Sequence, residues 1–146
     1  MSSLGTTLHG TWQLVSRIDR TKAGERRIEP SLGEDPIALL YYDRSGHFAA
    51  QFMKRDRSGP LFEAAAAGQN NSRAQGGYDA YFGTYTIDEA DATVTQTLVG
   101  ALSKESVGVV VTRQMEVEGD TLTIRLATTA PDGEPLVRTL TWQRVG

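Results

Sequence analysis

The sequence predicts an all-β fold, an eight-stranded antiparallel up-and-down barrel. Most of the chain alternates polar and apolar residues in short runs rich in Thr, Val, Leu, Tyr and Phe, which is typical of half-buried strands. Turns between the later runs are short, so sequential strands should pair as antiparallel neighbours. Two stacked sheets or one closed sheet would protect the strand edges, and the sequential connectivity favours closure. An eight-stranded barrel can hold one small ligand, so closure predicts a binding cavity.

Composition limits the class of protein. The chain has 146 residues, 39% of them hydrophobic, a formal net charge of -3 and no cysteine. This length suits one domain over residues 1–146, since domains most often hold roughly 100–150 residues. Without cysteine there is no disulfide, thiolate metal site or catalytic thiol. With 15 Lys and Arg against 18 Asp and Glu, no nucleic-acid partner is expected.

The sequence also predicts where the protein works. No segment approaches the ~20 apolar residues that span a bilayer. Residues 1–10 carry neither the basic segment nor the apolar one of a signal peptide. We therefore expect a cytoplasmic protein with no membrane partner.

The first predicted strand runs from Gly10 to Asp19. Strict alternation would place four side chains on one of its faces, Trp12, Leu14, Ser16 and Ile18. A polar connection over residues 20–36 follows, and its prolines cannot continue a ladder.

A hairpin comes next, with strands over Ile37–Tyr42 and His47–Lys54. Its turn, Asp43-Arg44-Ser45-Gly46, fits a type I turn that is closed by a left-handed glycine. Two registers that differ by one residue suit such a turn, and the choice between them exchanges the faces of the strands. The faces of His47 and Gln51 therefore stay open.

The segment from Arg55 to Ala80 interrupts the strand pattern. Leu61–Ala67 is rich in helix formers and is followed by Gly68, a suitable helix end. A second helical turn is expected over Tyr78–Tyr81. We expect a short helical lid insertion between the third and fourth strands.

Five further strands complete the predicted barrel. Each is separated from the next by a turn containing Asp, Glu, Gly or Ser. They cover Tyr81–Ile87, Thr93–Leu102, Val107–Val117, Thr121–Thr128 and Leu136–Val145.

Several motifs, in order along the chain, resemble those of the bacterial lipocalin-like domain family. They are Gly10-Thr11-Trp12-Gln13-Leu14-Val15-Ser16, Gly33-Glu34-Asp35-Pro36, the segment Tyr41 through Gln51 around Ser45-Gly46, Tyr81-Phe82-Gly83-Thr84-Tyr85, and Leu140-Thr141-Trp142-Gln143-Arg144. The resemblance implies a calycin-type barrel that holds small hydrophobic or amphipathic molecules. It implies no single reaction, because a fold does not fix a function.

The two ends of the chain carry a pair that is expected to close the barrel. In an up-and-down barrel the first and last strands are neighbours, which places Trp12 beside Arg144. A guanidinium over an indole contributes about 0.5–2 kcal/mol. We expect this pair to be structural and not catalytic.

Candidate ligand-binding or catalytic residues are polar residues on otherwise apolar strand faces. Within such faces lie Arg113, Gln96, Arg138, Tyr81, Tyr85 and Tyr42. Each also has an ordinary explanation, because an Arg can reach the rim and a Tyr can pack its ring with a satisfied hydroxyl. A buried Arg without a carboxylate partner would indicate an anionic ligand.

His47 is the one histidine within the predicted sheet and could act as a general acid or base. The alternative is a solvent-facing residue that follows a turn, and Gln51 would share its face. With only His9 besides it, a multi-histidine metal site is excluded. No nucleophile elbow, Walker loop or dinucleotide motif is present, so no cofactor is expected.

Three functions follow from this sequence. The first is binding of a small hydrophobic or amphipathic molecule in the barrel cavity. The second is a cofactor-independent enzyme, an isomerase, cyclase or lyase, acting on a hydrophobic, aromatic or polyketide-like metabolite. The third is a solid barrel whose outer face binds a protein. The sequence is also compatible with a homodimer.

Overall fold

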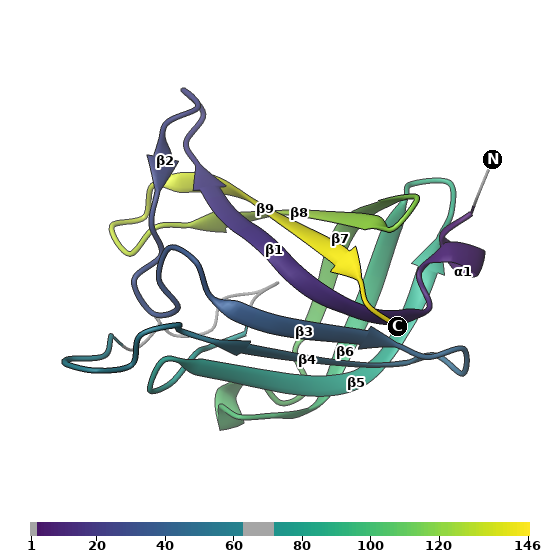
Figure 1. Cartoon of the computed structure of the whole chain (residues 1–146), viewed down its shortest axis with the longest axis horizontal. Coiled ribbons are helices and arrows are strands. Elements are labelled where there is room, and N and C mark those ends of the chain that lie inside the picture. The colour runs from purple at the N-terminus through teal and green to yellow at the C-terminus, as the bar shows by residue number, and fades with distance from the viewer. Residues whose placement is uncertain (1–2, 63–71) are drawn as a thin grey trace.

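The computed structural model describes residues 3–62 and 72–146. These residues form a closed antiparallel barrel of eight long strands, with a two-residue strand, β2, beside β1. Neighbours follow the chain order from β3 to β9, and β1 pairs with both β3 and β9 (Figure 1). The predicted up-and-down barrel is confirmed. The elements are α1 (Leu4–Thr7), β1 (Gly10–Arg20), β2 (Arg26–Arg27), β3 (Ile37–Tyr42), β4 (His47–Met53), β5 (Tyr78–Asp88), β6 (Thr93–Ala101), the 3-10 helix η1 (Lys104–Ser106), β7 (Val110–Glu118), β8 (Thr121–Thr129) and β9 (Pro135–Arg144).

The two ends of the barrel differ. At the α1 end lie α1, the C terminus and the tight turns after β3, β5 and β7 (Figure 1). At the opposite end, the loop end, lie the longer connections over residues 21–36, 54–62, 72–77 and 102–109. Among the described residues, no helix is long and apolar enough to cross a membrane.

Strand boundaries agree with the sequence within three residues, with one substantive error. Residues 78–81 form no helical turn, because Tyr78 pairs with Met53 and β5 continues along β4 as far as Thr84. This pairing satisfies the backbone groups that a helical turn would leave without partners in the sheet. Most of the predicted helix over Leu61–Ala67 lies outside the described residues.

The turn between β3 and β4 sets the register of the hairpin. The Asp43 carboxylate accepts hydrogen bonds from the backbone N–H groups of Ser45 at 2.9 Å and His47 at 2.8 Å. Tyr42 then pairs with Phe48, and the alternation buries Phe48 and leaves His47 outside.

A β-bulge in β1 changes which residues face the interior. The register against β9 shifts between Leu14 and Ser16, and Val15 lies outside with 54% exposure. Strict alternation was therefore wrong beyond Leu14, since one inserted residue exchanges the faces. Arg17 and Asp19 turn inward in place of Ile18 and Ser16.

The α1 end is closed by a dense apolar core. Its largest side chains, Trp12 and Trp142, are 0% and 1% exposed. The Trp12 indole Nε1 donates to the Leu8 carbonyl at 2.9 Å, which attaches the segment after α1 to β1. Burying one such side chain contributes about 1.5–3 kcal/mol.

Candidate functional site

Three inward-facing side chains away from the α1 end retain slight exposure. Phe52, Arg113 and Leu126 are 7–8% exposed, although they face the barrel interior, whereas Trp12 and Leu122 are fully buried. Part of the accessible surface of the described interior therefore lies in the middle and at the loop end of the barrel.

An aromatic wall lines this interior. The Tyr81 ring stacks on Phe52 at 6.4 Å and lies 6.0 Å from Phe48, measured between ring centroids. Phe52 in turn makes an edge contact with Trp142 at 5.7 Å. β4, β5 and β9 thus contribute one continuous set of aromatic contacts inside the barrel.

Tyr42, Gln96 and Tyr85 form a second group deeper in the barrel. The Tyr42 hydroxyl donates to Gln96 Oε1, and burial raises its pKa well above the ordinary value. Its ring makes an edge contact with Tyr85 at 5.0 Å, and the Tyr85 hydroxyl donates to the Asp43 carbonyl. The structure brings these three residues together. Both tyrosine hydroxyls and the side-chain oxygen of Gln96 already take part in hydrogen bonds within the protein.

Arg138 faces inward, as alternation along β9 indicated, and it is paired. Its guanidinium donates two hydrogen bonds to Asp19, at 2.7 and 3.0 Å, across the pairing of β1 with β9. Asp19 is 3% exposed and the Arg138 side chain 12%. Arg138 therefore has a carboxylate partner within the protein.

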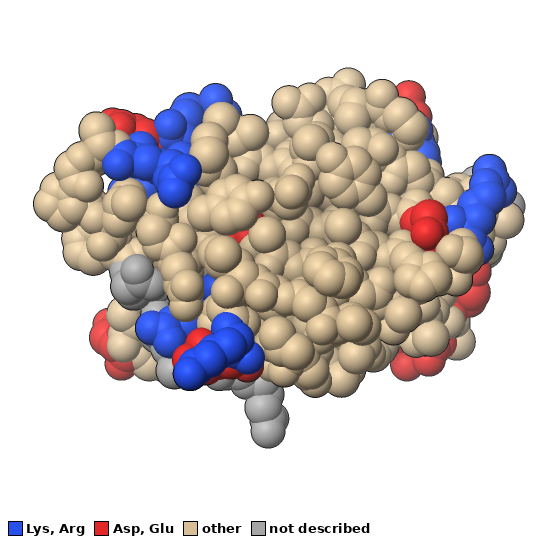
Figure 2. Space-filling view, turned by 90° about the horizontal axis from the view of Figure 1, so that it is seen from below, with Lys and Arg blue, Asp and Glu red and all other residues tan. Residues whose placement is uncertain are grey.

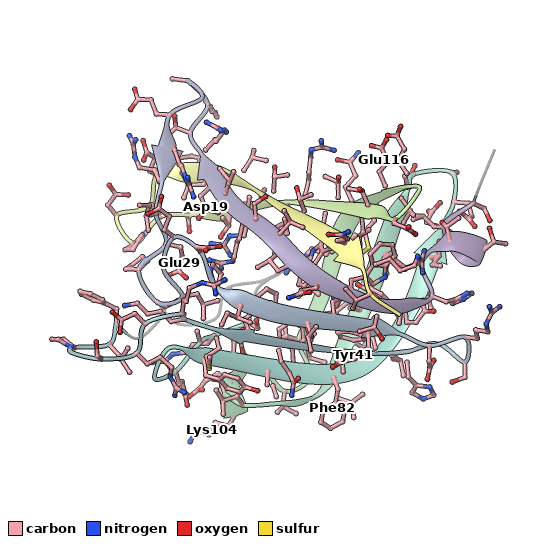
Figure 3. All side chains as sticks on the ribbon, in the orientation of Figure 1. Asp19, Glu29, Tyr41, Phe82, Lys104 and Glu116 are labelled. Carbon is pink, nitrogen blue, oxygen red and sulfur yellow. The ribbon has the colours of Figure 1, made fainter. Side chains whose placement is uncertain are left out.

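A second arginine, Arg17, lies beside this pair. Arg17 Nη1 is 3.3 Å from Glu29 Oε1, and Figure 3 shows Glu29 near Asp19 at the loop end. Burial lowers the pKa of Arg17 to about 10, and the positive charge of Arg138 adds to this effect.

Arg113 completes a group of three interior arginines. It is 8% exposed, and its Nη1 donates to the Thr112 carbonyl at 3.3 Å. Burial lowers its pKa, while the nearby Tyr81 and Tyr42 act in the opposite direction and Arg138 lowers it further.

A buried carboxyl, Asp79, lies on the inner face of β5 near Tyr81. Ser72 Oγ donates to Asp79 Oδ2 at 2.6 Å, whereas the buried Oδ1 has no hydrogen-bond partner among the described residues. Burial raises the pKa of Asp79. The pKa of Tyr81 is raised to about 12, chiefly by burial and then by the charge of Asp79.

Sequence reasoning missed Arg17, Asp19, Glu29 and Asp79. Arg17 and Asp19 were missed because the bulge in β1 reverses which residues face inward after Leu14. Glu29 was missed because it lies in a long connection and not in a strand. One signal could have found Asp19: a buried Arg138 needs a carboxylate, and the neighbouring first strand offers one.

His47 and Gln51 leave the candidate site, because the register of the hairpin turns both outward. The His47 imidazole is exposed, with Nδ1 2.9 Å from Ser45 Oγ and 3.6 Å from Asp43 Oδ2. The His47 side chain therefore contacts residues of the turn and not the barrel interior. Among the described residues, no cluster of three or more His, Cys, Asp or Glu side chains could hold a metal ion.

Trp12 and Arg144 meet where the first and last strands pair. The Arg144 guanidinium lies 4.3 Å from the centroid of the Trp12 ring. It also donates to the carbonyls of Thr7 and His9. This geometry joins β9 and β1 to the end of α1 and the residues that follow it, and it supplies no group to the interior.

The fold and the site together define a closed up-and-down barrel with an aromatic wall and a small set of interior polar groups. The sequence matches the lipocalin-like domain family over residues 9–145, and the chain belongs to that family. No curated protein matches the sequence.

Proposed function

We propose that the protein binds a small hydrophobic or amphipathic molecule inside the barrel, entering from the loop end. A lipocalin-like barrel generally suggests binding of a small molecule in a cavity. The observation that carries the proposal is the residual exposure of Phe52, Arg113 and Leu126, which face inward yet are not fully buried.

The chemistry of the inner wall also supports binding. Ligand sites are mostly apolar, with a few polar groups that fix orientation. Here Phe52, Tyr81 and Leu126 supply apolar surface, and Arg17 and Arg113 supply charged donors. Such a wall suits a molecule with an apolar body and one polar end.

The test is native mass spectrometry of the purified protein, followed by a thermal-shift screen of hydrophobic and aromatic acids, alcohols and esters. A ligand that binds only the folded protein raises the apparent melting temperature by mass action. We expect a co-purifying small molecule or a concentration-dependent stabilisation. If no compound binds, this function is wrong.

A second candidate function is supported by Asp79 and Tyr81. A buried carboxyl with a raised pKa and one oxygen free of partners can transfer a proton to or from a bound molecule. This chemistry suits a cofactor-independent isomerase, cyclase or lyase. In that case Asp79→Asn would abolish conversion of a bound compound and leave its affinity nearly unchanged, which mass spectrometry of the products would show.

A further inference from the structure

Charged side chains are unevenly distributed over the outside of the barrel. Between its two ends, the described residues place no Asp, Glu, Lys or Arg on the outer side of β3, β4, β5 and β6, which we name the uncharged face. Asp79 in β5 faces inward, and Asp88 lies beside the turn at the α1 end. The outer sides of β7 and β8, by contrast, carry Glu116 and Arg125. Figure 2 views the molecule from the side on which β4 and β5 lie in Figure 1, and a broad uncharged area separates charged groups near the two ends.

Phe82 lies near the middle of the uncharged face. Its side chain is 56% exposed and points away from the barrel (Figure 3). A Cβ atom at Gly100 in β6 would overlap with the Phe82 ring, so the ring lies over this glycine and is supported by the neighbouring strand. The bulge between β5 and β6 adds Val99, which is 57% exposed. A supported aromatic side chain loses little conformational freedom on binding, and aromatic residues contribute strongly at protein interfaces.

Large and small residues alternate across this face. The pairing of β3, β4, β5 and β6 places Tyr41, Ala49, Phe82 and Gly100 side by side in one row. Neighbouring strands lie about 4.8 Å apart, so the backbones at Tyr41 and Phe82 are about 10 Å apart. The small side chain of Ala49 lies between them. The row therefore leaves room above Ala49 for one large side chain of a partner.

Such a row is complementary to itself. Consider a twofold axis that lies in the plane of contact and runs along the strands, between β4 and β5. It places Phe82 of one copy over Ala49 of the other, and by symmetry the second Phe82 lies over the first Ala49. The same rotation places Tyr41 of each copy opposite Gly100 of the other. Each large residue of the row then meets a small one.

Charge favours a second copy over other partners. Nucleic acids and anionic membranes bind through Lys and Arg, which the described residues of this face do not supply. Recognition of a different protein commonly uses opposite charges. Two copies of this chain carry the same formal net charge of -3, and contact through the uncharged face keeps like charges from facing each other.

The size of the face also suits a dimer. Four strands about 4.8 Å apart, each about 25 Å long, cover about 500 Å². Burial of this face on both copies therefore removes about 1,000 Å² from solvent, which is the total area that a specific interface requires.

We infer that the protein forms a symmetric homodimer through the uncharged face, with Phe82 of each copy packed against Ala49 of the other. The contact uses outward-facing residues and leaves the loop end of both barrels open. The inference is therefore independent of the proposed function, and either can fail without the other.

The first test measures the mass of the full wild-type chain in solution. Sedimentation equilibrium at a series of concentrations up to about 100 μM covers the dissociation constants expected for a specific interface of this size. We expect a concentration-dependent approach to twice the mass of 15.9 kDa. The mass of a single chain at every concentration would overturn the inference.

The second test locates the interface with two identical substitutions. Ala49→Arg adds a long charged side chain to the uncharged face, and we expect dimerisation to weaken at least about tenfold. The matched control is Ala127→Arg, at an exposed position of the outer side of β8, which should keep the wild-type dissociation constant. Circular dichroism checks that both variants fold. If Ala49→Arg dimerises as well as the wild type, or if both variants weaken the dimer equally, the contact lies elsewhere and the inference is wrong.

The third test examines which residues face each other. Ala49→Lys and Phe82→Glu should each dimerise poorly alone, because each repeats one charge on both sides of the contact. A mixture of the two variants should associate at least about tenfold more tightly than either alone, since the introduced charges are then opposite and adjacent. If mixing gives no tighter association, Phe82 does not face Ala49 and the inferred dimer is wrong.

Discussion

Asp19 and Arg138 are partners in the pairing that closes the barrel, and their side chains are joined inside it by two hydrogen bonds of 2.7 and 3.0 Å. The β-bulge near Val15 makes this contact, because it turns Asp19 inward. Closure of the sheet and the charge balance of the interior therefore depend on the same pair.

Asp19→Asn should destabilise the protein by about 3–5 kcal/mol, because removing one partner of a buried ion pair leaves an uncompensated charge. Chemical denaturation measures the free energy of unfolding. The double variant Asp19→Leu with Arg138→Leu should recover most of the loss, since it leaves no charge unpaired. A loss below about 1 kcal/mol for Asp19→Asn, as for an exposed pair, would contradict this account.

Arg144→Lys should lower the free energy of unfolding by about 1–2 kcal/mol. Lysine keeps the positive charge, but it cannot both lie flat on the Trp12 ring and donate to the carbonyls of Thr7 and His9. Gln143→Ala, at an exposed position of the same strand, is the control and should change stability by less than about 0.5 kcal/mol. If both substitutions change the free energy of unfolding equally, Arg144 does not contribute to closing the barrel.

Gly83→Ala should be among the more damaging small substitutions in the sheet. A Cβ atom at this position would lie 1.8 Å from the Thr97 carbonyl oxygen and 2.8 Å from the Val99 nitrogen, so the bulge between β5 and β6 would have to open. We expect a loss of about 1–3 kcal/mol or more, measured by chemical denaturation. Thr84→Ala, at the exposed neighbouring position, serves as control. A similarly small loss of stability for both variants would show that the bulge can accommodate a Cβ atom at position 83.

The pH dependence of stability should reveal the burial of Asp79. Its pKa in the folded protein is raised above its ordinary value of 3.8, so the folded state binds the proton more tightly than the unfolded state. The stability linked to this group is present below about pH 4 and is lost as the pH rises through the raised pKa.

Asp79→Asn removes that dependence. The variant should therefore be more stable than the wild type at neutral pH, and its advantage should shrink toward acidic pH. Denaturation of both proteins across a series of pH values gives the difference directly, and the other titrating groups, Glu29 among them, cancel in the comparison. A constant difference at all pH values would mean that Asp79 is not perturbed by burial.

Much of the fold could be predicted from the sequence, because alternation reports directly on which side of a strand is buried. The same alternation correctly placed Arg113 and Gln96 inside the barrel. It failed where a single residue breaks the period. The bulge in β1 has no signature in the residues around Val15, and it decides whether Arg17 and Asp19 are inside.

Other parts of the candidate site depend on contacts distant in sequence. The register of the hairpin depends on the hydrogen bonds that the Asp43 carboxylate accepts within the turn. That register places His47 outside the barrel. Glu29 comes from a connection without regular structure, and Asp79 lay in a segment whose residue types suggested a helical turn. Its strand conformation comes from pairing with Phe52 in β4, which local propensity does not report.

The most direct test of small-molecule binding in the barrel interior is to fill that interior. Leu126 faces inward from β8 and Arg125, the residue before it, faces outward. Leu126→Trp and Arg125→Trp therefore add the same ring on opposite sides of the wall. With both variants folded, as circular dichroism will show, titration calorimetry with the compound that most stabilises the wild type in the thermal-shift screen should find binding lost in Leu126→Trp and unchanged in Arg125→Trp. Undiminished binding in Leu126→Trp would place the ligand elsewhere and contradict the account.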